Sequence, residues 1–359
     1  MSMTDSPQND STAVETGAPR APWAASEQPS HEPGVPRKGV AAVGHFLLWS
    51  VIAVAAVLLV SIAVQVVITV IGTIVILVRD RLDSDPDMAS GDLLAIMIAS
   101  QLASIAIFAP WWKRVRRRGL GVARGSGEAT RIRSGERAKS FALALLGIAL
   151  IGIALQVLIS LALNIILPLF PEVLNEYNEL METGGTEEFA LFPVLSVAVL
   201  APISEELTVR GVALQFALRG VCPAWGKRAE PEAYAKIPVG PLRFWAANII
   251  QALAFGILHL NITQGVYAFA IGMVLGWMFG RTGRLRYGIA LHLAINFSSY
   301  FVGEFYGVFG ILGDWGVIVA PVVCLLVGLR LFARAVPVDS DAALAHMERA
   351  RGRRTGAAI

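Results

Sequence analysis

The stretch from Phe189 to Leu218 reads FALFPVLSVAVLAPISEELTVRGVALQFAL and decides the class of the fold. Its residues are almost all apolar, apart from Glu205, Glu206 and Arg210 in its second half. A helix of this length rises about 45 Å at about 1.5 Å per residue, which exceeds the roughly 30 Å of bilayer hydrocarbon. An ionisable residue at the centre of such a helix costs roughly 2.5 to 3.5 kcal/mol. Three of them together predict a buried polar site within a membrane-spanning helix.

The composition of the whole chain agrees with a membrane location. Of its 359 residues, 55% are hydrophobic and 16% are charged, and the mean hydropathy is +0.62. The apolar residues form long uncharged blocks instead of stripes on amphipathic helices. We therefore predict an all-α, polytopic integral membrane protein. The net charge of +3 gives no reason to expect a nucleic-acid partner.

Eight segments of the chain are predicted to be transmembrane helices. The stretch 244–280 is uncharged for too long to be one helix, and the polar run from Asn261 to Gly265 divides it into two. The other predicted segments are 44–78, 93–112, 141–170, 189–218, 287–301 and 315–329. A count of about eight places both ends of the chain on the same side of the membrane.

The loops between these segments alternate in charge, which predicts the orientation of the chain. Lys and Arg are concentrated in the loops 113–139, 219–243 and 281–286 and in the C-terminal tail, whereas the loops 83–92 and 172–188 are acidic. Basic loops remain on the cytoplasmic side of a membrane. Both termini are therefore predicted to be cytoplasmic, in a multi-pass protein of the plasma membrane.

Composition also divides the chain into four parts. Residues 1–40 are rich in Ser, Pro, Thr and acidic residues and are predicted to form a disordered cytoplasmic tail. Residues 41–188 are expected to hold three transmembrane helices and a basic cytoplasmic loop. Residues 189–335 are expected to hold the helices with the polar site, and residues 336–359 to form a basic cytoplasmic tail.

The three charged residues differ in the partners that are open to them. Glu206 and Arg210 are four residues apart, share a helix face and have the favourable order of acid before base. We interpret them as a structural salt bridge. Glu205 points about 100° away around the helix, so the same arginine cannot serve both carboxylates equally well. Glu205 therefore requires other polar partners.

Two further predicted helices offer such partners. Phe255 and His259 are four residues apart on one of them, and His292 and Asn296 are four apart on the other, so each pair shares a face. A lone histidine in a membrane helix is often a helix–helix hydrogen-bonding residue. Beside Glu205, however, one imidazole could help to take a proton from water, while a second imidazole and an amide stabilise an oxyanion. These are the groups that a hydrolase requires when it uses no covalent intermediate.

The same residues could instead hold a metal ion. Glu205, His259 and His292 would supply three zinc ligands and leave a fourth position open for water. They lack the compact H-E-x-x-H spacing of many zinc proteases. The sequence therefore leaves open both a glutamate-activated and a metal-activated water.

Three motifs, in this order along the chain, resemble those of a known family. They are E-E-x-x-x-R at 205–210, F-x-x-x-H at 255–259 and H-x-x-x-N at 292–296. Together they are similar to the motifs of the CPBP or Abi family, which comprises the type II CaaX prenyl endopeptidases and their bacterial relatives. The similarity covers about residues 190–300.

This resemblance implies a role for each residue of the polar set. Glu205 would be the general base, and His259 would help to hold the attacking water. His292 and Asn296 would stabilise the oxyanion. The residues that brace and pack the site would be Glu206, Arg210 and Phe255. The implied enzyme is an intramembrane endopeptidase of the glutamate or metallo type, with 189–335 as its catalytic helices.

The predicted function is thus hydrolysis of a peptide bond near the membrane, in CaaX-type, bacteriocin or membrane-protein processing. The expected partners are a peptide or protein substrate, with or without an attached lipid, and the surrounding membrane lipid. Zinc is the one cofactor considered, and the oligomeric state is left open. A transporter or proton-relay protein would also place Glu, His and Arg inside a bundle. A catalytically silent immunity or scaffold protein with the same fold is a further alternative.

Overall fold

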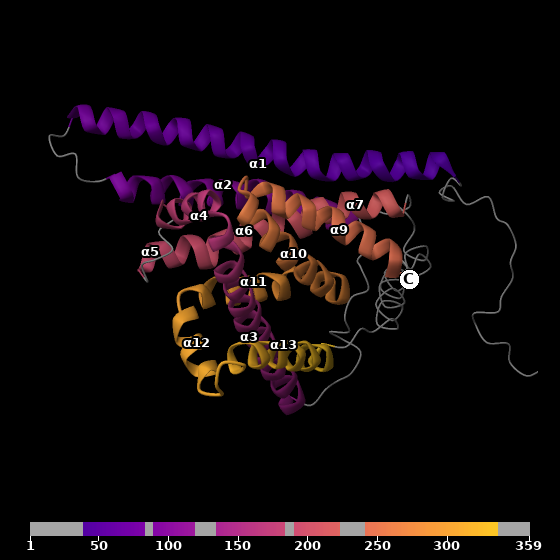
Figure 1. Ribbon diagram of the computed structural model, residues 1–359. Coiled ribbons are helices and arrows are strands. Elements are labelled where there is room, and N and C mark those ends of the chain that lie inside the picture. Colours follow the sequence, from indigo (N-terminus) through magenta and orange to yellow (C-terminus); the bar gives the residue numbers. More distant parts are fainter. Residues whose placement is uncertain (1–38, 83–88, 119–133, 184–189, 223–240, 337–359) are drawn as a thin grey trace, which may run out of the picture. The chain divides into compact units, whose positions relative to one another are not determined.

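The computed structural model describes residues 39–82, 89–118, 134–183, 190–222 and 241–336 (Figure 1). All of these residues fall within one unit of the chain, Pro36–Ile359. The predicted N-terminal and C-terminal tails and most of the basic loop 113–139 lie outside the described residues.

Every regular element among the described residues is helical, as predicted for an all-α chain. The N-terminal part contains α1 (Val40–Leu82), α2 (Ala89–Arg118), α3 (Ser134–Ile166), η1 (Leu167–Leu169) and α4 (Pro171–Thr183). A nearly continuous helix follows, formed by α5 (Leu191–Val194), η2 (Leu195–Leu200), α6 (Ala201–Thr208), η3 (Val209–Ala213) and α7 (Leu214–Val221). The last helices are α9 (Pro241–Leu258), α10 (Ile262–Thr282), α11 (Leu285–Ser299), α12 (Val302–Gly310) and α13 (Gly316–Ala335).

Six helical stretches among the described residues are long and apolar enough to cross a membrane. They are Val40–Arg79, Gly91–Val115, Ala138–Leu169, Leu191–Val221, Ile262–Thr282 and Gly316–Ala335. The two other segments predicted to span the membrane are also helices, but α9 and α11 have 18 and 15 residues. A bilayer core of average thickness requires about 20 residues. The polytopic all-α architecture is confirmed, whereas the count of eight spans is not.

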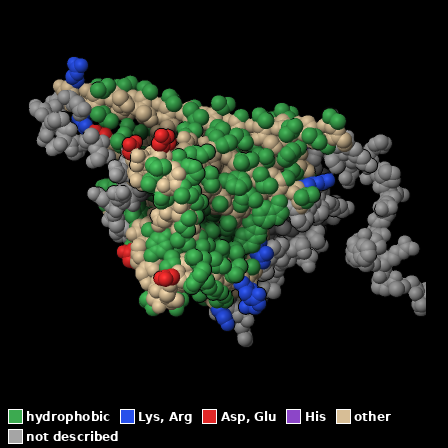
Figure 2. Space-filling model, in the orientation of Figure 1, with side chains coloured by type: hydrophobic (Ala, Val, Ile, Leu, Met, Phe, Trp, Pro, Cys, Tyr) green, Lys and Arg blue, Asp and Glu red, His purple; other side chains and the backbone are tan. Residues whose placement is uncertain are grey.

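Apolar side chains face outward over much of the bundle. On α1, Val66, Val70 and Ile74 are each more than half exposed. On α13, Val323 and Leu326 are half exposed or more. Figure 2 shows apolar side chains across most of the visible face. Soluble monomers rarely expose contiguous apolar patches of more than a few hundred Å², so this surface is suited to contact with lipid.

Two π-helical segments interrupt the helix that carries the three charged residues. They are η2 and η3, which lie directly before and after α6. Pro202 accounts for the first, because its ring disturbs the preceding turn and its nitrogen has no hydrogen to donate. The N–H of Ala201 bonds to the carbonyl of Ser196, one residue farther back than in an α-helix. Such π segments are frequent at functional sites.

Glycines allow α10 to pack closely against α9. A Cβ atom added at Gly276 would overlap the side-chain amide of Asn248, and one added at Gly280 would overlap the ring of Phe244. Both neighbours belong to α9, so these glycines serve helix packing within the chain. This packing fixes the position of α9, the helix that carries Phe255 and ends just before His259.

Candidate active site

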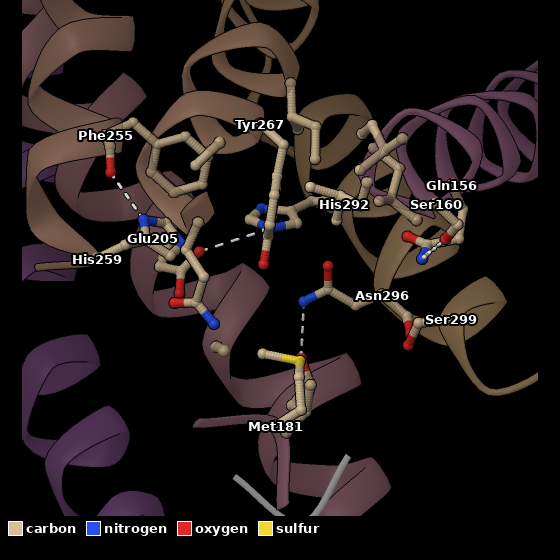
Figure 3. A pocket seen from close by; sticks show the side chains of 18 of the residues that line it. Gln156, Ser160, Met181, Glu205, Phe255, His259, Tyr267, His292, Asn296 and Ser299 are labelled. Carbon is tan, nitrogen blue, oxygen red and sulfur yellow. Dashed lines mark hydrogen bonds and ion pairs between the residues drawn. The ribbon is translucent and has the colours of Figure 1, made fainter. Parts of the chain in front are cut away.

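Five of the predicted site residues line one cavity of about 580 Å³ (Figure 3). They are Glu205, Phe255, His259, His292 and Asn296. These residues come from α6, from α9 and the turn that follows it, and from α11. A volume of this size lies within the range of typical ligand pockets in proteins. The fold therefore brings together, at one cavity, residues that are distant along the chain.

Glu205 contacts His292 across this cavity. Oε2 of Glu205 lies 3.5 Å from Nε2 of His292, and the Glu205 side chain is 31% exposed, against 4% for His292. The second nitrogen of His292, Nδ1, lies 3.4 Å from Oε1 of Glu206. One imidazole therefore lies between the two adjacent carboxylates, and Glu205 is the carboxylate that remains accessible from the cavity.

Glu206 and Arg210 form a buried ion pair, as the spacing predicted. Nη1 of Arg210 donates a hydrogen bond to Oε1 of Glu206 at 2.7 Å, and neither side chain is exposed. Nη2 of Arg210 donates to the carbonyl oxygen of Gly272 at 3.2 Å. Removal of one partner from a buried pair typically costs about 3 to 5 kcal/mol. The pair thus connects α6 to α10 beside the cavity.

Phe255 packs against three of the polar side chains. Its ring meets His259 edge to face, with 4.9 Å between the centroids, and meets His292 in the same way at 5.6 Å. Cζ of Arg210 lies 4.6 Å from the centroid of the ring, which is a favourable cation–π distance. Since Phe255 is 1% exposed, its ring holds these groups in fixed positions.

The turn after α9 determines the orientation of His259. Nδ1 of His259 lies 2.8 Å from the carbonyl oxygen of Phe255. A carbonyl oxygen can only accept, so the proton lies on Nδ1 and Nε2 is left as an acceptor. The next residue, Leu260, has a φ of 53°, a left-handed conformation that costs a residue with a Cβ roughly 1 to 2 kcal/mol. Asn261 then caps α10 by accepting from the N–H of Gln264 at 3.0 Å.

Asn296 is positioned by a backbone group that Pro202 leaves unpaired. In η2 each backbone N–H bonds to the carbonyl five residues before it, and the N–H of Ala201 bonds to that of Ser196. The carbonyl of Val197 would pair in the same way with the N–H of residue 202. That residue is Pro202, which has no N–H. Nδ2 of Asn296 donates to this carbonyl at 2.9 Å instead. The proline on α6 and the asparagine on α11 are therefore parts of one arrangement.

These residues lie in a segment that the chain shares with a known family. Residues 187–298 match the family described as type II CAAX prenyl endopeptidase, Rce1-like. The predicted family is confirmed. The Rce1-like segment contains the seven site residues taken from the motifs, and its family implies protease activity in a membrane. No curated protein and no solved structure gave a match.

Helices outside the Rce1-like segment complete the cavity. They are α2, α3, α4 and, through Val302, α12, and the lining residues of α2 and α3 include Gln101, Gln156 and Ser160. From α4, Tyr177 also lines the cavity and is hydrogen-bonded to Tyr267 of α10. Burial raises the pKa of Tyr177 above its ordinary value. The N-terminal helices therefore contribute directly to the site of the Rce1-like segment.

A second cavity of about 240 Å³ meets the first at Glu205 and His259. Its opposite wall is formed by polar side chains of α1 and α2, namely Ser61, Gln65, Ser100, Gln101 and Ser104. The hydroxyl of Ser100 is buried and has no hydrogen-bond partner among the described residues. Glu205 and His259 thus lie where two cavities join.

The zinc site considered from the sequence stays a prediction. Among the described residues, no group of three or more His, Cys, Asp or Glu side chains is placed to hold a metal ion. Glu205 and His292 contact one another directly, and Nδ1 of His259 is occupied by the carbonyl of Phe255, which leaves Nε2 as the nitrogen available to a proton or a metal ion. The mechanism proposed for this site is written with water and the protein's own side chains.

A second set of buried polar residues lies on α9 and was not predicted from the sequence. Nε2 of Gln251 donates to the carbonyl of Gly272 at 2.9 Å and to Oδ1 of Asn248 at 2.7 Å. The carbonyl of Gly272 is the one that also accepts from Arg210. A signal was present, because Gln251, Phe255 and His259 follow one another at intervals of four and so share a helix face.

Gly288 and Tyr267 were also missed. A Cβ atom added at Gly288 would lie 2.6 Å from Oε2 of Glu206, so the glycine provides space for that carboxylate. Gly288 lies four residues before His292, on the same face of α11. Tyr267 points into the cavity near Asn296 (Figure 3). The sequence held no charge or motif that would have indicated Tyr267.

Proposed function

We propose that this protein is a membrane-embedded endopeptidase in which Glu205 activates water for attack on a peptide bond. The family match supports protease activity. The observation that carries the mechanism is the pairing at the cavity of an accessible carboxylate, Glu205, with two histidines that line the same space. No serine or cysteine needs to act as a nucleophile. Ser204, the nearest hydroxyl in sequence, donates to the carbonyl of Ala201 at 2.9 Å.

Glu205 would be the general base. Its neighbour Glu206 is fully buried and bound to Arg210, so Glu205 is the carboxylate that cavity water can reach. His259 would hold the same water by accepting one of its hydrogens at Nε2. Glu205 would take the other proton as the water oxygen attacks the carbonyl carbon, and would return it to the leaving amine. Proton transfer of this kind contributes about 10² to 10⁴ in rate.

His292 and Asn296 would stabilise the oxyanion that forms on the substrate. Asn296 uses one amide hydrogen for the carbonyl of Val197, which fixes the amide and leaves its second hydrogen for the substrate. Tyr267 points into the same part of the cavity (Figure 3), where its hydroxyl is hydrogen-bonded to Tyr177. A positioned hydrogen-bond donor of this type lowers the activation free energy by about 2.7 to 4 kcal/mol.

The junction of two cavities supports cleavage within a polypeptide. An endopeptidase must accommodate chain on both sides of the bond that it cuts. The larger cavity would hold one side and the smaller cavity, between α1, α2 and α9, would hold the other, with Glu205 and His259 at the junction. The walls mix apolar and hydrogen-bonding groups, which suits a polypeptide segment at a membrane. The transporter alternative is not favoured by the family match.

The test compares the termini of membrane proteins by mass spectrometry. Cells that lack this protein are complemented with the wild type, with Glu205→Gln or with Glu172→Gln. Glu172 is exposed on α4 and does not line the cavity, so it is a matched control for the same chemical change. We expect new termini with the wild type and Glu172→Gln, and a decrease of about 100-fold or more with Glu205→Gln.

Immunoblotting of the membrane fraction establishes that all three proteins are inserted to the same level. Identical termini in cells with wild type and with Glu205→Gln would refute the proposed mechanism. A set of termini that is also identical in cells without the protein would favour the silent scaffold or the transporter.

A further inference from the structure

The described charged residues are divided between the two ends of the helices. At one end, α2, α7, α10 and α13 finish and α3, α9 and α11 begin, and we call this the basic end. Its described charged side chains are Lys113, Arg114, Lys139, Arg219, Arg243, Arg281, Arg284, Arg286, Arg330 and Arg334. Arg281 donates to the carbonyl of Ala333 at 2.8 Å, which joins the ends of α10 and α13. None of the side chains described at this end belongs to Asp or Glu.

The opposite end, which we call the acidic end, carries most of the described carboxylates outside the cavity. They are Asp92, Glu172, Glu176, Glu179, Glu304 and Asp314. The described basic residues here are Arg79 and Arg81, and Arg79 is paired with Asp92 through two hydrogen bonds of 2.7 Å. Figure 2 shows the acidic side chains gathered at the left and most basic ones at the right and below.

The larger cavity lies entirely in the half of the bundle nearer to the acidic end. Along the helix Leu191–Val221, its lining residues stop at Glu205. On α10 they extend from Gln264 to Ile271, whereas the helix continues to Thr282. On α11, which begins at the basic end, the lining begins at His292. The wall is completed by α4 and by Val302 of α12, both at the acidic end.

These two observations together define the side from which the site is reached. Basic ends of membrane helices remain in the cytoplasm because Lys and Arg are retained there during insertion. The geometry points to a catalytic cavity that opens to the extracytoplasmic side, so that the enzyme cleaves polypeptide presented from that side. The chemistry of cleavage rests on the proposed function, whereas the direction of opening does not.

This direction restricts the class of substrate. A C-terminal CAAX box on a cytoplasmic protein would approach the basic end, where no described residue lines the larger cavity. An exported peptide, or an extracytoplasmic segment of another membrane protein, would approach at the acidic end. We therefore assign the substrate to the second group, and prenylation of a cytoplasmic C-terminus is not required.

The test is the labelling of single cysteines in the full-length protein. Cys222 and Cys324 are the two native cysteines and are replaced by Ser. Into this background we introduce Met181→Cys in the cavity wall, Leu312→Cys at the acidic end, or Lys139→Cys at the basic end. Leu312 is 71% exposed and Lys139 is also exposed. A membrane-impermeant maleimide is applied to intact cells and, separately, to permeabilised cells.

We expect Met181→Cys and Leu312→Cys to react in intact cells, and Lys139→Cys to react at least tenfold more after permeabilisation than before. Reaction of Lys139→Cys in intact cells would overturn the inference. Failure of Met181→Cys to react while Leu312→Cys reacts would overturn it as well, because the cavity would then be closed to that side. Labelling does not depend on proteolysis, so a loss of the proposed function would leave the result unchanged.

Discussion

Substitution of Gly288 by Ala places one methyl group against the buried carboxylate that braces the site. The added Cβ would lie 2.6 Å from Oε2 of Glu206 and 3.4 Å from its carboxyl carbon, whereas ordinary contacts begin at 3.4 Å. The carboxylate must therefore move by about 0.8 Å. Glu206 is bound to Arg210 at 2.7 Å and has His292 at 3.4 Å, so this shift disturbs both contacts. Overpacking of this kind typically costs about 1 to 3 kcal/mol.

Gly307→Ala is the matched control. Gly307 is also in a helix, α12, and a Cβ atom added there would have no neighbour within 4 Å. Alanine is favoured over glycine in a helix by about 0.5 to 1 kcal/mol, and this gain applies to both variants. We therefore expect Gly307→Ala to unfold at or above the wild-type temperature, and Gly288→Ala to unfold below Gly307→Ala by an amount equivalent to about 1 to 3 kcal/mol.

The assay is thermal unfolding of the purified proteins in detergent, followed by tryptophan fluorescence. Activity is measured in parallel by the appearance of the new termini in cells. A misplacement of about 1 Å in a catalytic site can cost about 10² in rate, so Gly288→Ala should also lose most of its activity. Equal unfolding temperatures for the two alanine variants would refute the packing of Glu206 against α11 described above.

Two further substitutions test the groups around this carboxylate. Arg210→Met would leave Glu206 buried without its cation, so we expect the free energy of unfolding to fall by about 3 to 5 kcal/mol, measured by thermal unfolding. The control is Arg243→Met, at an exposed position, which should change the free energy of unfolding little. Similar decreases in both variants would contradict the buried ion pair. Asn296→Leu would leave the carbonyl of Val197 without its donor, so we expect the free energy of unfolding to fall by about 1 to 3 kcal/mol. The variant would also lack the amide donor to the oxyanion, so we expect the rate of cleavage to fall by a factor of about 10² to 10³. Wild-type cleavage by this variant would remove Asn296 from the oxyanion site.

The fold class and the polar set followed from the sequence because charges are costly inside a membrane. Glu205, Glu206 and Arg210 stand out against an apolar background, and such residues are retained where they have partners. The four-residue spacings of the motifs then identified which side chains share a helix face. The same signal was weaker for Gln251, an uncharged residue, and it was absent for Gly288, which contributes space instead of a polar group.

The number of spans illustrates a different limit of the sequence. Apolar length and alternating loop charge predicted eight, but α9 and α11 are shorter than a span of average length. Both helices pack against longer ones, α9 against α10 and α11 against α3, and each carries site residues. Hydropathy records how apolar a segment is, and it does not record whether neighbouring helices or lipid surround it.

The sequence by itself determined the all-α membrane architecture and the family of residues 187–298, and it predicted seven polar and aromatic residues for the site. Each of these depends on properties of single segments, namely apolar length, charge and spacing. The tertiary structure alone decided that His292 lies between the two carboxylates, that Asn296 binds the carbonyl exposed beside Pro202, and that α1 to α4 complete the cavities. These features depend on the directions in which side chains of different helices point after packing, and local periodicity does not specify those directions.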